Sequence, residues 1–216
     1  METRIATPHD MDAVWALTHD VYLQEGYCEP QESGRLIHYP HLDGIAETIV
    51  YIAEVDGELV GTNSLTLDGP AGLHVDQDFP VETAVMREWC NHMDYRLGAS
   101  WRIVTDPAYH TTTSVASALF TATILGILEY DLEVVLFQFN PKHARVYKRL
   151  LGLTVLATGH CGTVSAPAVL MGGQTNQCRD KWRRFLAKEE ARQALAAGRK
   201  TATEDAMDYR ENASDV

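Results

Sequence analysis

The residues best suited to chemistry gather in one stretch, residues 137–152. An apolar run there ends at Asn140-Pro141, a pair that stops a strand, and a short helical stretch with Tyr147 follows before a Leu-Leu-Gly stop. A cluster of cations on this stretch suits a phosphate-bearing or acidic partner, although each cation alone is equally explained as a solvated helix residue. The members of this basic cluster are Lys142, Arg145, Lys148 and Arg149.

The charge of the rest of the chain makes the basic cluster stand out. The formal net charge is −12, yet residues 142–188 hold 9 basic residues and 1 acidic residue. Residues 1–141 hold 5 basic and 22 acidic residues. A short positive patch on an acidic protein predicts a small anionic or acidic partner. It argues against nucleic acid, because the rest of the surface would repel a polyanion.

Two other kinds of chemistry lack support in the sequence. The 4 cysteines are scattered and form no CxxC pair, which predicts free thiols in a reducing cytoplasm. Neither His160-Cys161 nor Cys90-Asn-His92 has the spacing of metal ligands, and no sequence neighbour activates a cysteine nucleophile. We therefore expect no metal and no permanently bound cofactor.

The bulk properties predict one soluble domain. The chain has 216 residues, of which 45% are apolar, enough to bury a substantial core. No apolar run is long enough to span a bilayer, and the N-terminus lacks the basic start and apolar middle of a signal peptide, so we expect a cytoplasmic protein. We predict a domain over 1–176, a basic helix over 177–198 and a disordered polar tail over 199–216.

The elements that must position these residues alternate between strands and helices. Asp56-Gly57 between two β-rich runs is a strong hairpin signal. Such an order is typical of a mixed α/β sheet with crossover helices. The expected elements are strand 4–7, a helix after residue 8, strands 47–54 and 58–67, helix 82–95, strand 100–105, helix 111–130, strand 134–139, a short helix with Tyr147, strands 153–157 and 168–171, and helix 180–197.

This order and four segments together resemble the GNAT superfold of N-acyltransferases. Within it, the chain is most similar to the N-acyl amino acid synthases of the FeeM type, relatives of the acyl-homoserine lactone autoinducer synthases. The resemblance implies an α/β fold with a mixed, mostly antiparallel central sheet flanked by helices. The segments are 21–27, 67–73, 101–107, and 140–147 with Leu150-Leu151-Gly152.

The resemblance also implies a reaction. A long acyl chain would move from a phosphopantetheine thioester on acyl carrier protein to the amine of an amino acid or similar small amine. Tyr147 would be the acid for the leaving thiolate, and ring packing at a helix end explains the same tyrosine equally well. The donor would be bound by Arg102, Ile103, Val104, Thr111, Thr112, Thr113, Ser114 and Asn140, and the basic cluster would contact the carrier protein or a phosphate.

The sequence does not identify the general base that would deprotonate the amine. In the autoinducer-type relatives a glutamate lies three residues before the equivalent of Arg102, and this chain has Ala99 there. A histidine titrates near neutral pH, so His110 is the expected substitute. The alternatives are the pair His38 and His41 with Asp43, and the helix acid Glu88.

The stretch before the central helix favours a carrier-protein donor. Free N–H groups at a helix start bind phosphate, and ordinary N-capping explains the same threonines. Acetyl-CoA-dependent GNAT enzymes have glycines in this loop, whereas residues 111–116 read Thr-Thr-Thr-Ser-Val-Ala. Two rival functions stay open: an acetyl-CoA-dependent N-acetyltransferase, and a non-catalytic acyl-binding module, which Ala99 favours.

Overall fold

A computed structural model describes residues 1–109, 113–164 and 166–212, and the side chains of these residues except at 113–114 and 196–212. Its sheet has the strand order β1-β2-β3-β4-β5-β7-β6. Neighbouring strands are antiparallel except β4 and β5, which run parallel, so the predicted mixed, mostly antiparallel sheet is confirmed. The strands are β1 (Glu2–Ile5), β2 (Thr48–Val55), β3 (Glu58–Leu67), β4 (Leu97–Thr105), β5 (Val134–Phe139), β6 (Thr154–Cys161) and β7 (Ala166–Gln174).

The predicted hairpin joins β2 to β3. Asp56 has φ +53° and Gly57 has φ +84°, the left-handed pair that a two-residue type I′ turn needs. The turn sets the register, in which Val55 pairs with Glu58 and Thr48 pairs with Thr66. This register fixes which β3 side chains face the site described below.

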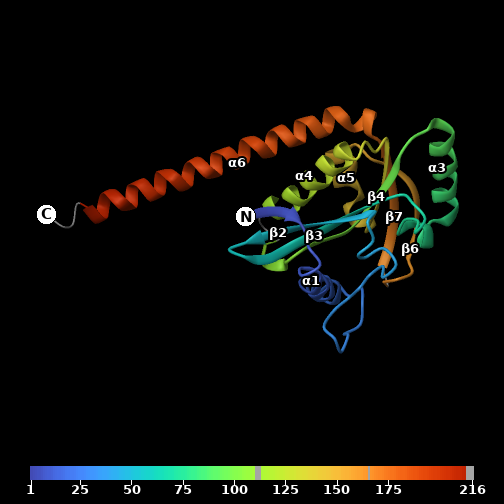
Figure 1. The fold of residues 1–216 in the computed structure, drawn as a ribbon, viewed down its shortest axis with the longest axis horizontal. Helices are drawn as coiled ribbons and strands as arrows, with labels where there is room; N and C mark the ends of the chain where they lie inside the picture. The colour runs from blue at the N-terminus through green and yellow to red at the C-terminus, as the bar shows by residue number, and fades with distance from the viewer. Residues whose placement is uncertain (110–112, 165, 213–216) are drawn as a thin grey trace.

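Helices cover both faces of the sheet, with α4 and α5 on one side and α1 on the other (Figure 1). No described helix is both long enough and apolar enough to cross a membrane. The helices are α1 (Met11–Gln24), α2 (Val75–Asp78), α3 (Pro80–Met93), α4 (Thr113–Glu129), α5 (Ala144–Leu151) and α6 (Thr175–Asn212), with short 3₁₀ turns at Pro107–Tyr109 and Pro141–His143.

Alternation along the strands divides the core between the two faces. On β5, Phe137 and Phe139 pack with the α4, α5 and α6 side chains, including the fully buried Trp182. Leu136 faces the opposite way and packs with Phe79 beside α3. Successive strand residues point to opposite faces, so the same strand supports two separate clusters.

Several element boundaries differ from the predicted ones. Helix α3 begins at Pro80, where the missing N–H of proline costs nothing, and it ends at the left-handed Asp94. Strands β6 and β7 are longer than predicted, because each pairs along its length with the other. The short helix α2 was not predicted, and α6 begins at Thr175 rather than at residue 180. The division into domain, basic helix and tail stays a prediction.

Candidate functional site

The sheet opens where its two parallel strands diverge. β4 and β5 pair from Leu97↔Val134 to Ser100↔Phe137 only, although β4 continues to Thr105. Past that point the facing edges have backbone N–H and C=O groups that a ligand with amide groups can pair with, as an added strand would. The predicted donor-binding residues Arg102, Ile103 and Val104 lie on this part of β4.

A β-bulge shapes the β4 side of the opening. Thr62 pairs with Val104 and Ser64 pairs with Trp101, so one β3 residue lies opposite both Arg102 and Ile103. Arg102 has φ +54°, a conformation that a non-glycine residue seldom adopts. The bulge breaks the usual alternation, and Trp101 and Arg102 therefore line the same cavity although they are adjacent in sequence.

Tyr147 approaches the opening from the face covered by α4 and α5. Its ring stacks on Phe139, the last residue of β5, with 3.8 Å between ring centroids, and lies 5.2 Å from the ring of Phe120. Burial raises the pKa of Tyr147 to about 12. The phenol is therefore protonated at neutral pH and can donate a hydrogen bond or proton to an anion in the opening.

Asn140 directly follows β5, and both ends of its side-chain amide make hydrogen bonds. Its side-chain oxygen accepts a hydrogen bond from the Lys142 backbone N–H at 3.1 Å, the local turn that sequence chemistry favours. Its amide nitrogen donates to the Tyr27 hydroxyl at 2.8 Å. The structure thus fixes Asn140 in place through both ends of its amide.

On the other face of the sheet, a small cavity lies against the opening. Its volume is about 80 Å³, and aromatic and imidazole rings make up much of its wall. Most of these rings pack edge to face, as Tyr39 does on Trp101 at 5.2 Å between centroids, while His74 is tilted on Trp101. We name this space the ring cavity; it is lined by Tyr22, Tyr27, His38, Tyr39, His74, Trp101, Arg102, Gln138, Phe139, Asn140, Cys161, Val164, Ala166, Pro167 and Ala168.

Arg102 is held in the wall of the ring cavity by a buried ion pair. Its Nη1 donates to both Asp43 carboxylate oxygens at 2.8 Å, and its Nη2 donates to Ser64 Oγ at 2.8 Å. The side chains of Arg102 and Asp43 are 0% and 4% exposed. The guanidinium lies 4.5 Å from the centre of the Trp101 ring, and Trp15 Nε1 donates to Asp43 at 3.1 Å.

His38 is the one predicted alternative base that lines the ring cavity. Its Nε2 lies 2.7 Å from Thr163 Oγ1 and 3.9 Å from Cys161 Sγ, and its Nδ1 lies 3.5 Å from the Tyr22 hydroxyl. Burial, reinforced by the Arg102 charge, lowers the pKa of His38 to about 3. Burial likewise holds the pKa of His74 well below its ordinary value. Both imidazoles are neutral at neutral pH.

These two histidines predict loss of stability in acid. The folded state keeps them neutral, so as the pH falls through 6.5 it binds fewer protons than the unfolded chain. Their contribution is complete above pH 6.5 and is lost as the pH falls, by about 1.4 kcal/mol per pH unit for each histidine. Urea unfolding at about pH 7 and about pH 5 measures this loss, and His74→Phe should make it smaller. Equal losses in the variant and the wild type would contradict the prediction.

The other predicted bases lie elsewhere. His41 and Glu88 are exposed, Glu88 on α3, and Asp43 is engaged by Arg102. His110, Thr111 and Thr112 lie outside the described residues, as do the side chains of Thr113 and Ser114, although Thr113 begins α4 as the helix-start prediction requires. Ala99 is fully buried on the ring-cavity face.

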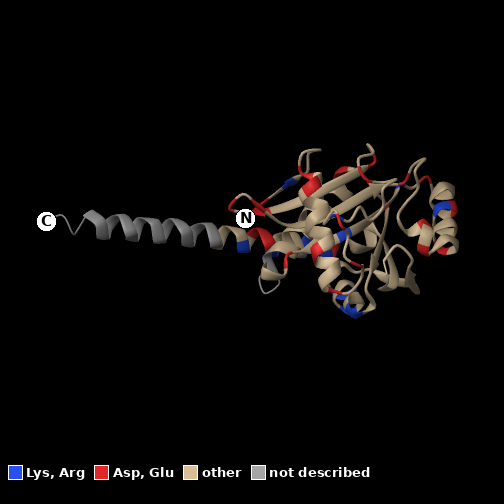
Figure 2. Ribbon diagram, turned by 90° about the horizontal axis from the view of Figure 1, so that it is seen from below, with Lys and Arg blue, Asp and Glu red and all other residues tan. Residues whose placement is uncertain are grey.

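The basic cluster is a surface feature. Lys142, Arg145, Lys148 and Arg149 are all exposed, and Lys142 pairs with Glu25 at 2.6 Å. Lys181 of α6 extends the surface, because its side chain lies over Gly152 at the end of α5. Acidic residues are spread over many other elements (Figure 2).

Of the residues that line the ring cavity, His38, Arg102 and Asn140 were predicted from the sequence as site candidates, and the others were missed, among them Tyr27, His74, Gln138 and Cys161. Tyr27 lies in one of the segments that carried the family resemblance, and Gln138 is the sole polar side chain in an apolar strand run, a signal that could have been used. His74 and Cys161 had no such signal, since only the fold brings them to the cavity. The described residues contain no cluster of three or more His, Cys, Asp or Glu arranged to hold a metal ion.

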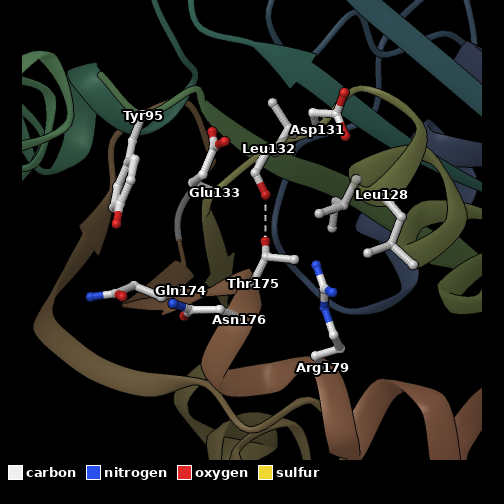
Figure 3. Close-up of a pocket in the computed structure, with 10 residues that line it drawn as sticks. Tyr95, Leu128, Asp131, Leu132, Glu133, Gln174, Thr175, Asn176 and Arg179 are labelled. Carbon is white, nitrogen blue, oxygen red and sulfur yellow. Dashed lines mark hydrogen bonds between the residues drawn. The ribbon is translucent and has the colours of Figure 1, made fainter. Parts of the chain in front are cut away.

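A second cavity, of about 130 Å³, lies near the start of β5 and the end of β7, away from the opening between β4 and β5 (Figure 3). Thr175, which begins α6, donates a hydrogen bond from Oγ1 to the Leu132 carbonyl there. Glu133 accepts from the backbone N–H of Arg96 at 2.7 Å. Fold-stabilising bonds thus account for these polar groups, and the ring cavity is the stronger candidate site.

Known proteins of similar sequence and structure indicate the family of the chain. A family described as N-acyl amino acid synthase FeeM matches residues 13–174. The solved structure of FeeM, an N-acyl amino acid synthase from uncultured soil microbes, is 25% identical with a TM-score of 0.70, and the match covers 83% of this chain and 93% of that one. No curated protein sequence matches the chain.

Two other solved structures share the fold. The CoA-dependent acyl-homoserine lactone synthase BjaI is 14% identical with a TM-score of 0.58, covering 82% of each chain. A GNAT-family acetyltransferase from Streptococcus pneumoniae is 16% identical with a TM-score of 0.52, covering 80% of this chain and 98% of that one. The fold is therefore that of the GNAT enzymes. The chain is an acyltransferase that belongs to the N-acyl amino acid synthase FeeM family.

Proposed function

We propose that this enzyme transfers a long-chain acyl group from the phosphopantetheine thioester of acyl carrier protein to the amine of an amino acid or similar small amine. One observation carries the proposal: the opening between β4 and β5 has a protonated tyrosine on one face and the ring cavity on the other. A thioester lying in the opening would meet an acid on its sulfur side and an acceptor on its carbonyl side. We propose the cytoplasm, where acyl carrier protein is charged, as its location.

The proposed reaction is direct attack. The neutral amine adds to the thioester carbonyl, the C–N bond forms, the C–S bond breaks, and the Tyr147 proton goes to the departing sulfur. The proton that the nitrogen loses on becoming an amide is released to water, and the Tyr147 phenolate takes a proton back from water, so the enzyme ends each turnover as it began. Free N–H groups on the unpaired edge of β4 would polarise the carbonyl. A poorly solvated cavity with buried, neutral imidazoles disfavours an ammonium ion, so it selects the acceptor in its unprotonated form.

Two features favour acyl carrier protein over CoA as the donor. The basic cluster is exposed on α5, the helix that carries Tyr147 to the opening, and on the 3₁₀ turn just before it. The stretch before α4 has threonine and serine where a loop that wraps a pyrophosphate has glycine. Against this, the similar synthase BjaI is described as CoA-dependent. Acetyl-CoA binding with micromolar affinity would favour the CoA-dependent alternative.

Charge reversal tests the carrier-protein surface. Lys148→Glu with Arg149→Glu should raise the KM for acyl carrier protein roughly tenfold and leave kcat unchanged, because the pair steers docking rather than chemistry. The effect should shrink as salt is added. Arg96→Glu is the matched control, since Arg96 is exposed at the other end of β4. Equal KM values for both variants would count against this surface.

Product analysis separates the enzyme from a non-catalytic binding module. Acyl carrier protein charged with octanoyl, dodecanoyl or hexadecanoyl chains is incubated with all common amino acids, and products are identified by mass spectrometry. An N-acyl amino acid is expected, and it identifies both substrates at once. Binding of acyl carrier protein without any acylated product would favour the module, the rival that Ala99 supports.

A further inference from the structure

Most of the buried polar side-chain atoms that lack a hydrogen-bond partner, among the described residues, belong to residues of the ring cavity. Among the described side chains, the buried nitrogen and oxygen atoms without a hydrogen-bond partner are His74 Nδ1 and Nε2, Arg102 Nε, Gln138 Oε1 and Thr121 Oγ1. All of these except Thr121 belong to residues that line the ring cavity. A buried polar atom that nothing pairs with destabilises the fold, so a concentration of such atoms in one cavity indicates a ligand.

The surrounding contacts determine what each group offers. Gln138 Nε2 donates to Asp78 at 2.7 Å, and Asp78 also accepts from the Gly162 N–H at 2.8 Å, which leaves Gln138 Oε1 as an acceptor. Arg102 uses both terminal nitrogens, which leaves its Nε–H as a donor. His74 is 1% exposed and offers one donor and one acceptor as a neutral ring.

These free donors and acceptors complement the two ends of an amino acid, its amine and its carboxylate. We propose that the ring cavity is the head-group subsite of the acceptor, in which Gln138 Oε1 accepts from the amine while Arg102 Nε–H and the His74 ring N–H donate to the carboxylate. This assignment rests on the proposed function and makes it more specific. Asp43 already balances the charge of Arg102, so the carboxylate is recognised through these two N–H donors, and hydrogen bonds to a charged group are the stronger kind.

The subsite lies where the reaction needs the amine. Gln138 follows Phe137, the last β5 residue paired with β4, and Arg102 lies just past Ser100, the last paired residue of β4. Both ends of the subsite therefore border the opening, where the thioester carbonyl would lie within reach of the amine on Gln138. A space of about 80 Å³ admits a small polar group rather than a whole bulky substrate.

Selectivity for a carboxylate provides the test. The best amino acid from the product analysis is compared with its primary amide, which keeps the amine and loses the negative charge. His74→Phe should lower kcat/KM for the acid by about 10- to 100-fold and leave the amide nearly unchanged. Gln138→Met should lower kcat/KM for the acid and the amide alike. His41→Phe, an exposed histidine near the cavity, is the matched control.

Stability distinguishes a ligand site from a structural histidine. Because His74 has no partner, His74→Phe should leave the Tm of the ligand-free protein unchanged or raise it. If the wild type is active and His74→Phe has the same ratio of kcat/KM for the acid to kcat/KM for the amide, the subsite assignment is wrong. The proposed function would still stand. If the wild type forms no product, calorimetry with the same amino acid decides: binding lost in His74→Phe supports the subsite, and no binding to either protein overturns it.

Discussion

Asp43→Ala is expected to lower the free energy of unfolding by about 3–5 kcal/mol. The substitution leaves the Arg102 guanidinium buried, 0% exposed, with Ser64 Oγ as its remaining hydrogen-bond partner. It also removes the acceptor of Trp15 Nε1. Chemical denaturation followed by tryptophan fluorescence measures the change.

Two comparisons make this prediction specific. Asp12→Ala removes an exposed partner of Arg35 and should cost far less stability than Asp43→Ala, because water screens that pair. The double variant Asp43→Leu with Arg102→Met should recover much of the lost stability, since no unpaired charge is left in the interior. If Asp43→Ala costs as little stability as Asp12→Ala, the buried pair of Asp43 and Arg102 is not what holds the loop between α1 and β2 on the sheet.

Tyr147→Phe should lower kcat by about 10²–10⁴-fold, the range that a positioned acid contributes. The ring stack on Phe139 needs no hydroxyl, so the fold and the KM for the donor should be preserved. Because the pKa of Tyr147 is raised to about 12, the wild type keeps its proton, and its acid function, at every pH below that value. Steady-state release of the free thiol, followed across the neutral and mildly alkaline range, measures both effects.

Tyr95→Phe is the matched control for the hydroxyl deletion. Tyr95 is half-buried like Tyr147 and packs edge to face on Trp89, but it lines the second cavity, away from the opening. Its removal should leave kcat unchanged. If Tyr147→Phe turns over as fast as the wild type, another group protonates the sulfur and Tyr147 is a packing residue only.

Local signals predicted much of the fold. Asp56-Gly57 forces the hairpin by backbone conformation alone, and the bounds of β5 were predicted correctly because an apolar run meets Asn140-Pro141. The helix with Tyr147 follows from the same segment. These features depend on a few neighbouring residues, so they can be read without knowledge of the rest of the chain.

The ring cavity could not be predicted in this way. Its walls come from α1, the loop after it, the segment before α2, and strands β4 to β7, which meet only in the folded sheet. The bulge at Arg102 depends on the pairing of β4 with β3 on either side of Asn63, and the charge of Arg102 is balanced by Asp43 from a distant loop. The sequence indicated that Arg102 faces a ligand but could not show that a carboxylate already holds it.

The two-sided opening between β4 and β5 has a consequence for the order of events. The donor and the acceptor would reach the thioester carbon from opposite faces of one sheet, so neither needs to leave before the other enters. We therefore expect a ternary complex and sequential kinetics, with intersecting rather than parallel double-reciprocal plots. The spent carrier and the acylated product could then depart in either order, each by its own route.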